Sequence, residues 1–176
     1  MVPLGPLNGK NLGTTLSPWI VTTDALESFQ TRAQAQTESP SLPPYLRDPD
    51  HVTYAIKLQV EILAGNTATV VGKSCISSLY WSIRQMIAHV ASAGSALRTG
   101  DVMATGTVTG AGTEEYGCLL EVTEGGKRPI QLQDGTKRRF LLDGDVVRLT
   151  AFAGDERSGV GFGECVGRLV PSRPFE

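Results

Sequence analysis

The sequence has few of the residues on which common metal sites and nucleophile sites depend. Its 176 residues include two histidines and three cysteines, and no two cysteines form a C-x-x-C pair. It also lacks a histidine pair with metal-ligand spacing and a Gly-x-Ser-x-Gly elbow. The scattered cysteines indicate neither a zinc site nor a disulfide framework, and they favour a reducing, cytoplasmic setting.

A strong charge of one sign and a long apolar run are also missing. The formal net charge is −2, and no Lys/Arg-rich stripe stands out, which argues against a nucleic-acid partner. No apolar stretch approaches the roughly 18 residues of a membrane span, and the first residues lack the pattern of a secretory signal. Hydrophobic residues at 40% and charged residues at 19% suit one globular domain over residues 1–176.

Alternating apolar and polar residues predict that the chain is rich in β-structure. Residues 53–63, TYAIKLQVEIL, alternate strictly, and residues 67–72 are expected to return antiparallel. Later segments resemble short strands separated by turn signals, and this cadence predicts a β-sandwich, roll or barrel. These segments are residues 101–108, 117–124, 128–133, 138–142, 145–152 and 160–170.

One long segment has helical rather than strand periodicity. Apolar residues recur at helical spacing within residues 77–94, with Ser77 or Ser78 as the expected N-cap and Gly94 at the C′ position. A short helical turn is expected at residues 23–29, capped by Thr23 or Asp24. Residues 30–50 are polar and rich in proline, so we expect an exposed excursion there. The whole predicts a β-rich α+β domain with one main helix.

The first loop holds a candidate site. Lys10 sits in the sequence NGKNLGTT, and the backbone N–H groups of Gly13, Thr14 and Thr15 are candidates to line a nest for an oxygen ligand. The alternative is a solvated lysine in a tight turn.

A second candidate site lies in the middle of the chain. Glu121 interrupts an apolar segment that we predict to be a strand, so its carboxylate either finds a donor or a cation or lies on the solvent face. Thr107 either donates its hydroxyl into the same space or closes a turn. His89 is expected to be a packed core residue, and His51 to be solvated.

Five segments together resemble one known family. They read VPLGPLNGKNLGTTLSPWIVTTDAL, LRTGDVMATGTVTG, YGCLLEVT, FLLDGDVVRLTAF and GFGECVGRLVP, in that order. The sequence is similar to the C-terminal half of the catalytic domain of the fumarylacetoacetate hydrolase family. The similarity runs nearly end to end and is weakest over residues 30–50. It implies a mixed β-roll.

The resemblance also implies a reaction and the roles of particular residues. The family hydrolyses a carbon–carbon bond of a β-diketo acid, as in tyrosine catabolism, with Mg²⁺ or Ca²⁺ as cofactor, and is commonly homodimeric. By position, Lys10 would steady the developing oxyanion near the metal, with Gly13 and Thr14 at neighbouring cation-site positions. Thr107 would contact a substrate carboxylate, and Glu121 would orient the histidine general base.

The sequence departs from the family in one large respect. The family's catalytic histidine, acidic metal ligands and arginine clamp lie upstream of the segment matched here, and neither His89 nor His51 matches the base. We therefore expect weak or absent metal-dependent hydrolysis from this polypeptide alone. Two alternatives stay open. One is a repurposed enzyme without a metal, in which Lys10 and Glu121 form an acid–base pair for enolisation, decarboxylation or cyclisation of a 1,3-dicarbonyl. The other is a non-catalytic relic or assembly partner.

Overall fold

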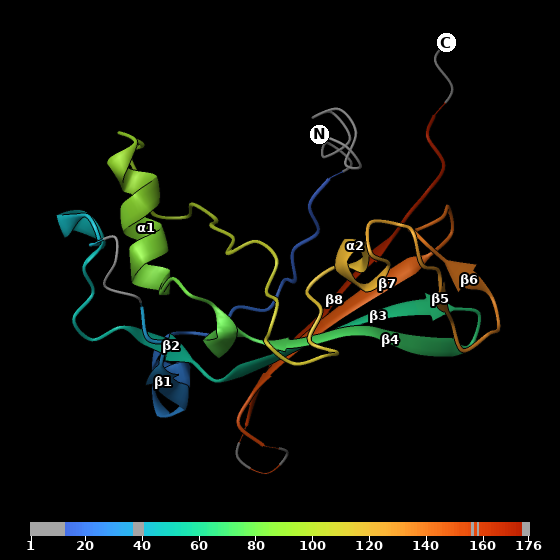
Figure 1. Ribbon diagram of the computed structural model, residues 1–176, viewed down its shortest axis with the longest axis horizontal. Coiled ribbons are helices and arrows are strands. Elements are labelled where there is room, and N and C mark those ends of the chain that lie inside the picture. The colour runs from blue at the N-terminus through green and yellow to red at the C-terminus, as the bar shows by residue number, and fades with distance from the viewer. Residues whose placement is uncertain (1–12, 37–40, 156, 158, 174–176) are drawn as a thin grey trace.

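A four-stranded antiparallel sheet forms the centre of the molecule (Figure 1). The structure is a computed structural model that describes residues 13–36, 41–155, 157 and 159–173. The strand order is β4-β3-β7-β8, so the β3–β4 hairpin pairs through β3 with the later β7–β8 hairpin. The strands are β3 (Ile56–Ala64), β4 (Thr67–Cys75), β7 (Val146–Ala153) and β8 (Val160–Arg168).

Register places the apolar residues of β3 and β7 on one face. Leu58 lies opposite Ala151, and Val60 opposite Leu149. This confirms the alternation read from the sequence. The opposite face carries Glu61, which is only 7% exposed and whose Oε2 accepts from the Arg148 Nε at 2.7 Å.

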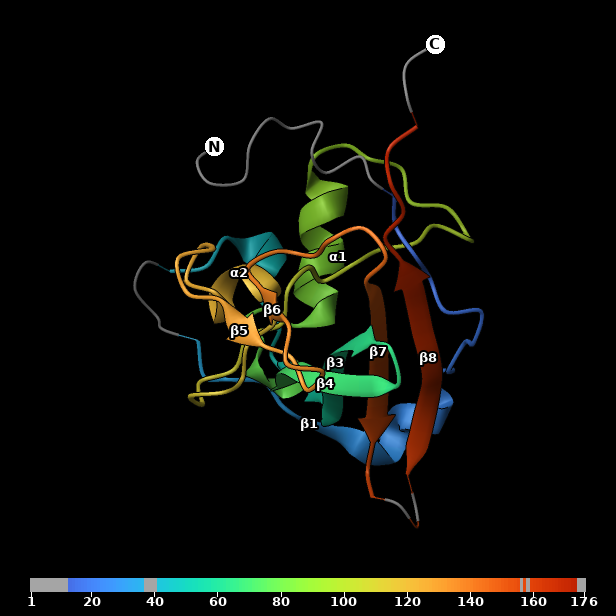
Figure 2. The same cartoon turned by 90° about the vertical axis from the view of Figure 1, so that its right-hand side faces the viewer.

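The best-packed apolar cluster closes the end of the sheet where β3 begins and β7 ends. Leu26 comes from the 3-10 helix η2 (Asp24–Phe29) and packs with Ile56 and Ala153, and all three are buried. Figure 2 shows η2 beside β7 and β8 at this end. Thr23 is the N-cap residue of η2, as expected, although its side chain makes no capping hydrogen bond.

A second group of elements lies to one side of the sheet (Figure 1). It consists of helix α1 (Ile83–Ser92), the 3-10 helix η3 (Pro44–Leu46), and the antiparallel pair β1 (Gln30–Arg32) and β2 (Val52–Tyr54). The prediction that residues 30–50 form an exposed excursion is therefore wrong in part. β1 is exposed, but Leu46 is buried, and its carbonyl accepts from the buried Gln85 Nε2 at 2.7 Å.

Helix α1 begins later than its periodicity suggests. Ser82, not Ser77 or Ser78, is the N-cap, because residues 76–78 form the separate 3-10 helix η4 (Ile76–Ser78). Ser82 Oγ accepts from the Gln85 amide, and Gln85 Oε1 accepts from the Ser82 amide, which completes a capping box. Gly94 has φ +82° and follows the C-cap Ala93, as predicted. No described helix has the length and apolar character needed to cross a membrane.

The middle of the chain differs most from its prediction. Residues 101–108 form no strand, and residues 119–122 form a helical turn, α2 (Leu119–Val122). The Thr123 amide donates to the Leu119 carbonyl at 3.0 Å, a local bond that replaces a ladder between strands. The next expected strands are shortened to β5 (Ile130–Gln131) and β6 (Lys137–Arg138), which pair with each other. The sheet-dominated α+β class with one main helix is confirmed.

Candidate functional site

An open pocket of about 360 Å³ lies over the apolar face of the sheet. Its floor comes from all four strands, its roof from residues 105–108 and Gly117, and one side from Ser17. Most of its side chains are apolar, and hydroxyl groups supply most of the polar ones. The lining residues that matter for the chemistry are Ser17, Leu58, Thr107, Gly117, Leu149 and Phe162.

The first described residues of the chain reach this pocket by running along β8, as Figure 2 shows. Trp19 covers Gly163, where a Cβ would lie 2.4 Å from the indole Cδ1. The Cys165 Sγ donates to the Thr15 carbonyl at 3.4 Å. This packing against β8 sets the half-buried Ser17 at the pocket wall.

The predicted residues of the first loop have different outcomes. Lys10 lies outside the described residues, so its place relative to Glu121 stays a prediction. Gly13 and Thr14 are exposed, and their predicted role near a cation also stays a prediction. Ser17 follows them closely and shares a pocket with Thr107. Ser17 is thus the residue of the first segment that the structure brings to Thr107.

Thr107 lies beside Gly117, and the two residues are the ends of the loop that connects them. Thr107 lines the pocket, and its methyl group approaches the backbone of Gly117. A Cβ on Gly117 would lie 2.4 Å from the Val108 carbonyl oxygen and 2.5 Å from Thr107 Cγ2. Only glycine permits this close approach, so Gly117 allows the exposed Thr107 to pack against the backbone there.

The Glu121 carboxylate accepts hydrogen bonds, as one of the two alternatives predicted, although Glu121 lies on a helical turn rather than on a strand. Thr109 Oγ1 donates toward both carboxylate oxygens, at 2.8 Å from Oε1 and 3.0 Å from Oε2. The Gly117 amide donates to Oε2 at 2.9 Å. The half-buried carboxylate is therefore held by a hydroxyl and an amide, beside the glycine that lines the pocket.

Sequence analysis missed Thr109 and Gly117. Its only relevant signal was that a carboxylate among apolar residues needs a donor. Nothing in the periodicity connects Glu121 with a threonine 12 positions away.

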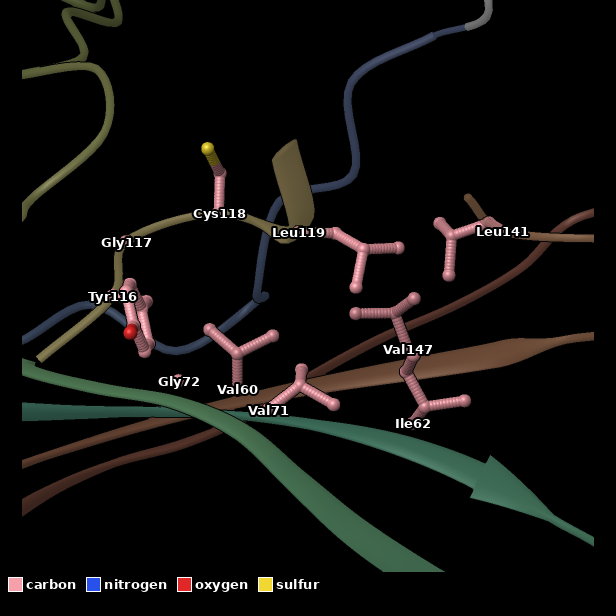
Figure 3. A pocket seen from close by; sticks show the side chains of 10 residues that line it. All are labelled: Val60, Ile62, Val71, Gly72, Tyr116, Gly117, Cys118, Leu119, Leu141 and Val147. Atoms are coloured by element: carbon pink, nitrogen blue, oxygen red, sulfur yellow. The ribbon is translucent and has the colours of Figure 1, made fainter. Parts of the chain in front are cut away.

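Helix α2, which carries Glu121, is attached to the sheet over a small apolar gap of about 150 Å³. Figure 3 shows the side chains of Leu119 and Leu141 directed toward Val147 of the sheet, while Cys118 points away. None of the described residues that line this gap carries a charge. It is packing space that supports α2, not a second site for a polar ligand.

Both histidines differ from their predictions. His89 is exposed on α1, so the prediction of a packed core residue is wrong. His51 is half-buried rather than solvated, and its buried Nε2 has no hydrogen-bond partner within the part of the chain that the structure describes. Neither histidine lines the pocket that contains Thr107.

The described donors do not by themselves fit a divalent cation. Within the described ranges, no three or more His, Cys, Asp or Glu side chains are grouped so that they could hold a metal ion. Mg²⁺ and Ca²⁺ take about six or more oxygen ligands. Glu121 is already bound to neutral donors. The cofactor that the resemblance implies therefore stays a prediction.

Comparison with known proteins confirms the resemblance seen in the sequence. The family model described as "Fumarylacetoacetate (FAA) hydrolase C-terminal" matches residues 1–170. The chain is 45% identical to a fumarylacetoacetase of Arabidopsis thaliana, with 98% of the chain and 41% of the relative covered. It is 46% identical to a fumarylacetoacetase of Oryza sativa subsp. japonica, with 98% of the chain and 40% of the relative covered. For that of Homo sapiens the identity is 39%, with 97% and 41% covered. The chain thus spans about two-fifths of the length of these relatives.

Proposed function

Because the chain belongs to the fumarylacetoacetate hydrolase family, we propose that it acts in the hydrolysis of a carbon–carbon bond of a β-diketo acid. One observation carries the proposal. The Glu121 carboxylate is fixed by Thr109 and Gly117 next to a pocket that also takes in Thr107 and Ser17. This places a negative charge and hydroxyl donors beside one apolar cavity.

The reaction needs a base that activates water. The hydroxyl of the water adds to a carbonyl carbon, the carbon–carbon bond breaks, and its electron pair leaves as an enolate that then takes up a proton. In our proposal Glu121 accepts the N–H of an imidazole base, holds its neutral tautomer, and stabilises the imidazolium that forms as the water loses its proton. Lys10 is proposed to meet the developing enolate oxygen.

The pocket would hold the substrate. The Thr107 hydroxyl is proposed to donate to the substrate carboxylate, while Leu58, Leu149 and Phe162 form an apolar floor. An apolar floor excludes water from the bound molecule and strengthens each hydrogen bond made to it. These residues therefore bind and orient the substrate, and Glu121 acts on the proton.

A turnover assay tests the proposal. Purified chain is incubated with an acylpyruvate, with and without Mg²⁺ or Ca²⁺, and the loss of enol absorbance is followed. Turnover by the chain without added imidazole is expected to be weak. It is expected to rise at least about tenfold when free imidazole supplies the base. Turnover that needs neither metal nor imidazole would favour the repurposed enzyme. Silence under all conditions from folded protein would overturn the catalytic proposal and favour the assembly partner.

We also propose that two copies of the chain associate. Large apolar side chains are exposed on β8 and the segment after it, at Val166 (44%) and Val170 (66%). In the described sheet β8 is an edge strand, and edges with apolar side chains favour pairing. Analytical ultracentrifugation should give the mass of two chains, and Val166→Lys should shift it toward one. A single-chain mass up to about 100 µM would contradict self-association.

A further inference from the structure

Two donors at opposite ends of one loop hold the Glu121 carboxylate, and the geometry points to a role for both. We propose that Thr109 and Gly117 are positioning residues for Glu121. This inference rests on the proposed function of Glu121 as the partner of the base. Together they fix the orientation of the carboxylate and leave Oε1 as the oxygen that receives the N–H of the base.

The Thr109 hydroxyl lies within hydrogen-bond distance of both Glu121 carboxylate oxygens, and this position restricts rotation of the carboxylate. One hydroxyl carries one donor hydrogen, and its oxygen lies 2.8 Å from Oε1 and 3.0 Å from Oε2. Both distances fall in the range of O–H···O bonds, which are stronger when the acceptor is charged. A donor placed between the two oxygens opposes rotation of the carboxylate in either direction.

The Gly117 amide makes the two oxygens unequal. Oε2 accepts from this amide at 2.9 Å as well as from Thr109, whereas among the described residues Oε1 accepts from Thr109 alone. A carboxylate has about four lone-pair sites. Oε1 therefore keeps the greater capacity for a further donor.

The loop between the two donors is closed by its own hydrogen bonds. The Gly110 amide donates to the Glu115 carbonyl at 2.9 Å, and the Gly112 amide donates to Glu115 Oε2 at 3.0 Å. Thr109 and Gly117 are thereby held at a set separation before any ligand binds. A preorganised carboxylate of this kind is what base orientation requires, since small misplacements in an active site reduce rates strongly.

The exposure of Thr109 makes its role testable apart from folding. Thr109 is exposed, so removal of its hydroxyl leaves no buried cavity. Thr109→Val keeps the shape of the side chain and removes the donor. Thr109→Ser keeps the donor. Thr113→Val changes an exposed threonine of the same loop and is the matched control.

Nuclear magnetic resonance of the labelled 176-residue chain tests the proposal without any assay of activity. The Gly117 amide proton donates to the charged Glu121 carboxylate, so its resonance should lie downfield, and Glu121→Gln should move it upfield. This upfield movement is the Gly117 response. Thr109→Val should produce at least about half of it, because the carboxylate is then free to rotate, while Thr109→Ser and Thr113→Val leave the resonance in place. An unchanged Gly117 resonance in Thr109→Val, or no rescue by serine, would overturn the positioning role.

The imidazole-supported turnover supplies the second readout. Thr109→Val is expected to lower kcat about tenfold with KM unchanged, and Thr109→Ser to restore it to within about twofold. If the unmodified chain shows no turnover, the proposed function fails, while the Gly117 response still decides whether Thr109 and Gly117 position the carboxylate.

Discussion

Asp145→Ala is expected to lower the free energy of unfolding by about 3–5 kcal/mol, because it leaves the half-buried Arg138 cation without its partner. Asp145 is 4% exposed. It accepts from Arg138 Nε at 2.8 Å and from the second guanidinium nitrogen at 2.9 Å, a bidentate pair. The Leu142 amide donates to the same carboxylate at 2.8 Å. The substitution therefore also removes a hydrogen bond that holds the turn before β7.

Urea unfolding followed by circular dichroism measures this effect. Asp143→Ala is the matched control, since Asp143 is an exposed carboxylate in the same connection between β6 and β7. Its substitution should change the free energy of unfolding by no more than about 0.5 kcal/mol. Equal effects of the two substitutions would show that the Arg138–Asp145 pair does not stabilise the fold.

The same pair predicts how stability depends on pH. The hydrogen bonds from Arg138 lower the pKa of Asp145 from its usual value, although burial opposes them. A carboxyl with a lowered pKa binds its proton more weakly in the folded than in the unfolded state. Its stabilisation is therefore complete above the unfolded pKa of about 3.9 and is lost as the pH falls through the lower folded pKa. Asp145→Ala should remove this part of the acid dependence.

The central sheet was predictable because its signal lies within each strand. The alternation in β3 records a sheet with one apolar face, and the register of β3 with β7 is consistent with it. The start of α1 was predicted wrongly at Ser77 or Ser78, although the sequence holds a signal for Ser82. Only Ser82 is followed at the right spacing by a glutamine, Gln85, that completes a capping box.

The local structure at Glu121 was not predictable from the same signals. The four residues 119–122 are too short to distinguish a strand period from a helical period. Close backbone packing decides between them. A Cβ on Gly72 of β4 would lie 2.5 Å from the Tyr116 carbonyl oxygen, so the loop lies directly on the sheet and turns there. Such contacts between distant segments leave no trace in periodicity.

The site was predictable only at the level of residue type. A carboxylate among apolar neighbours requires donors, and the structure supplies them from Thr109 and Gly117. The burial of α1 was overestimated for a related reason. Ile87 and Val90 lie on its apolar stripe but are each 40% exposed. A period shows which residues share a face, and only the packed structure shows how far that face is covered.

Glu121→Gln is expected to lower imidazole-supported turnover of an acylpyruvate about 100-fold or more, with KM within about threefold of its original value. Glutamine keeps the shape of the side chain, and its amide oxygen can still accept from the Gly117 amide. It carries no negative charge, so it does not stabilise the imidazolium that forms as the water loses its proton. The effect should therefore fall on kcat, because the charge is needed only as the reaction proceeds.

The matched control for this substitution is Glu124→Gln. Glu124 lies just after α2, is exposed, and pairs with Arg128 at 2.7 Å. An exposed pair of this kind contributes little to stability, so turnover should stay within about twofold. Initial rates at a range of substrate concentrations separate kcat from KM for both variants. If Glu121→Gln loses no more than Glu124→Gln, the carboxylate held by Thr109 and Gly117 has a purely structural role, because its charge then makes no difference to the chemical step.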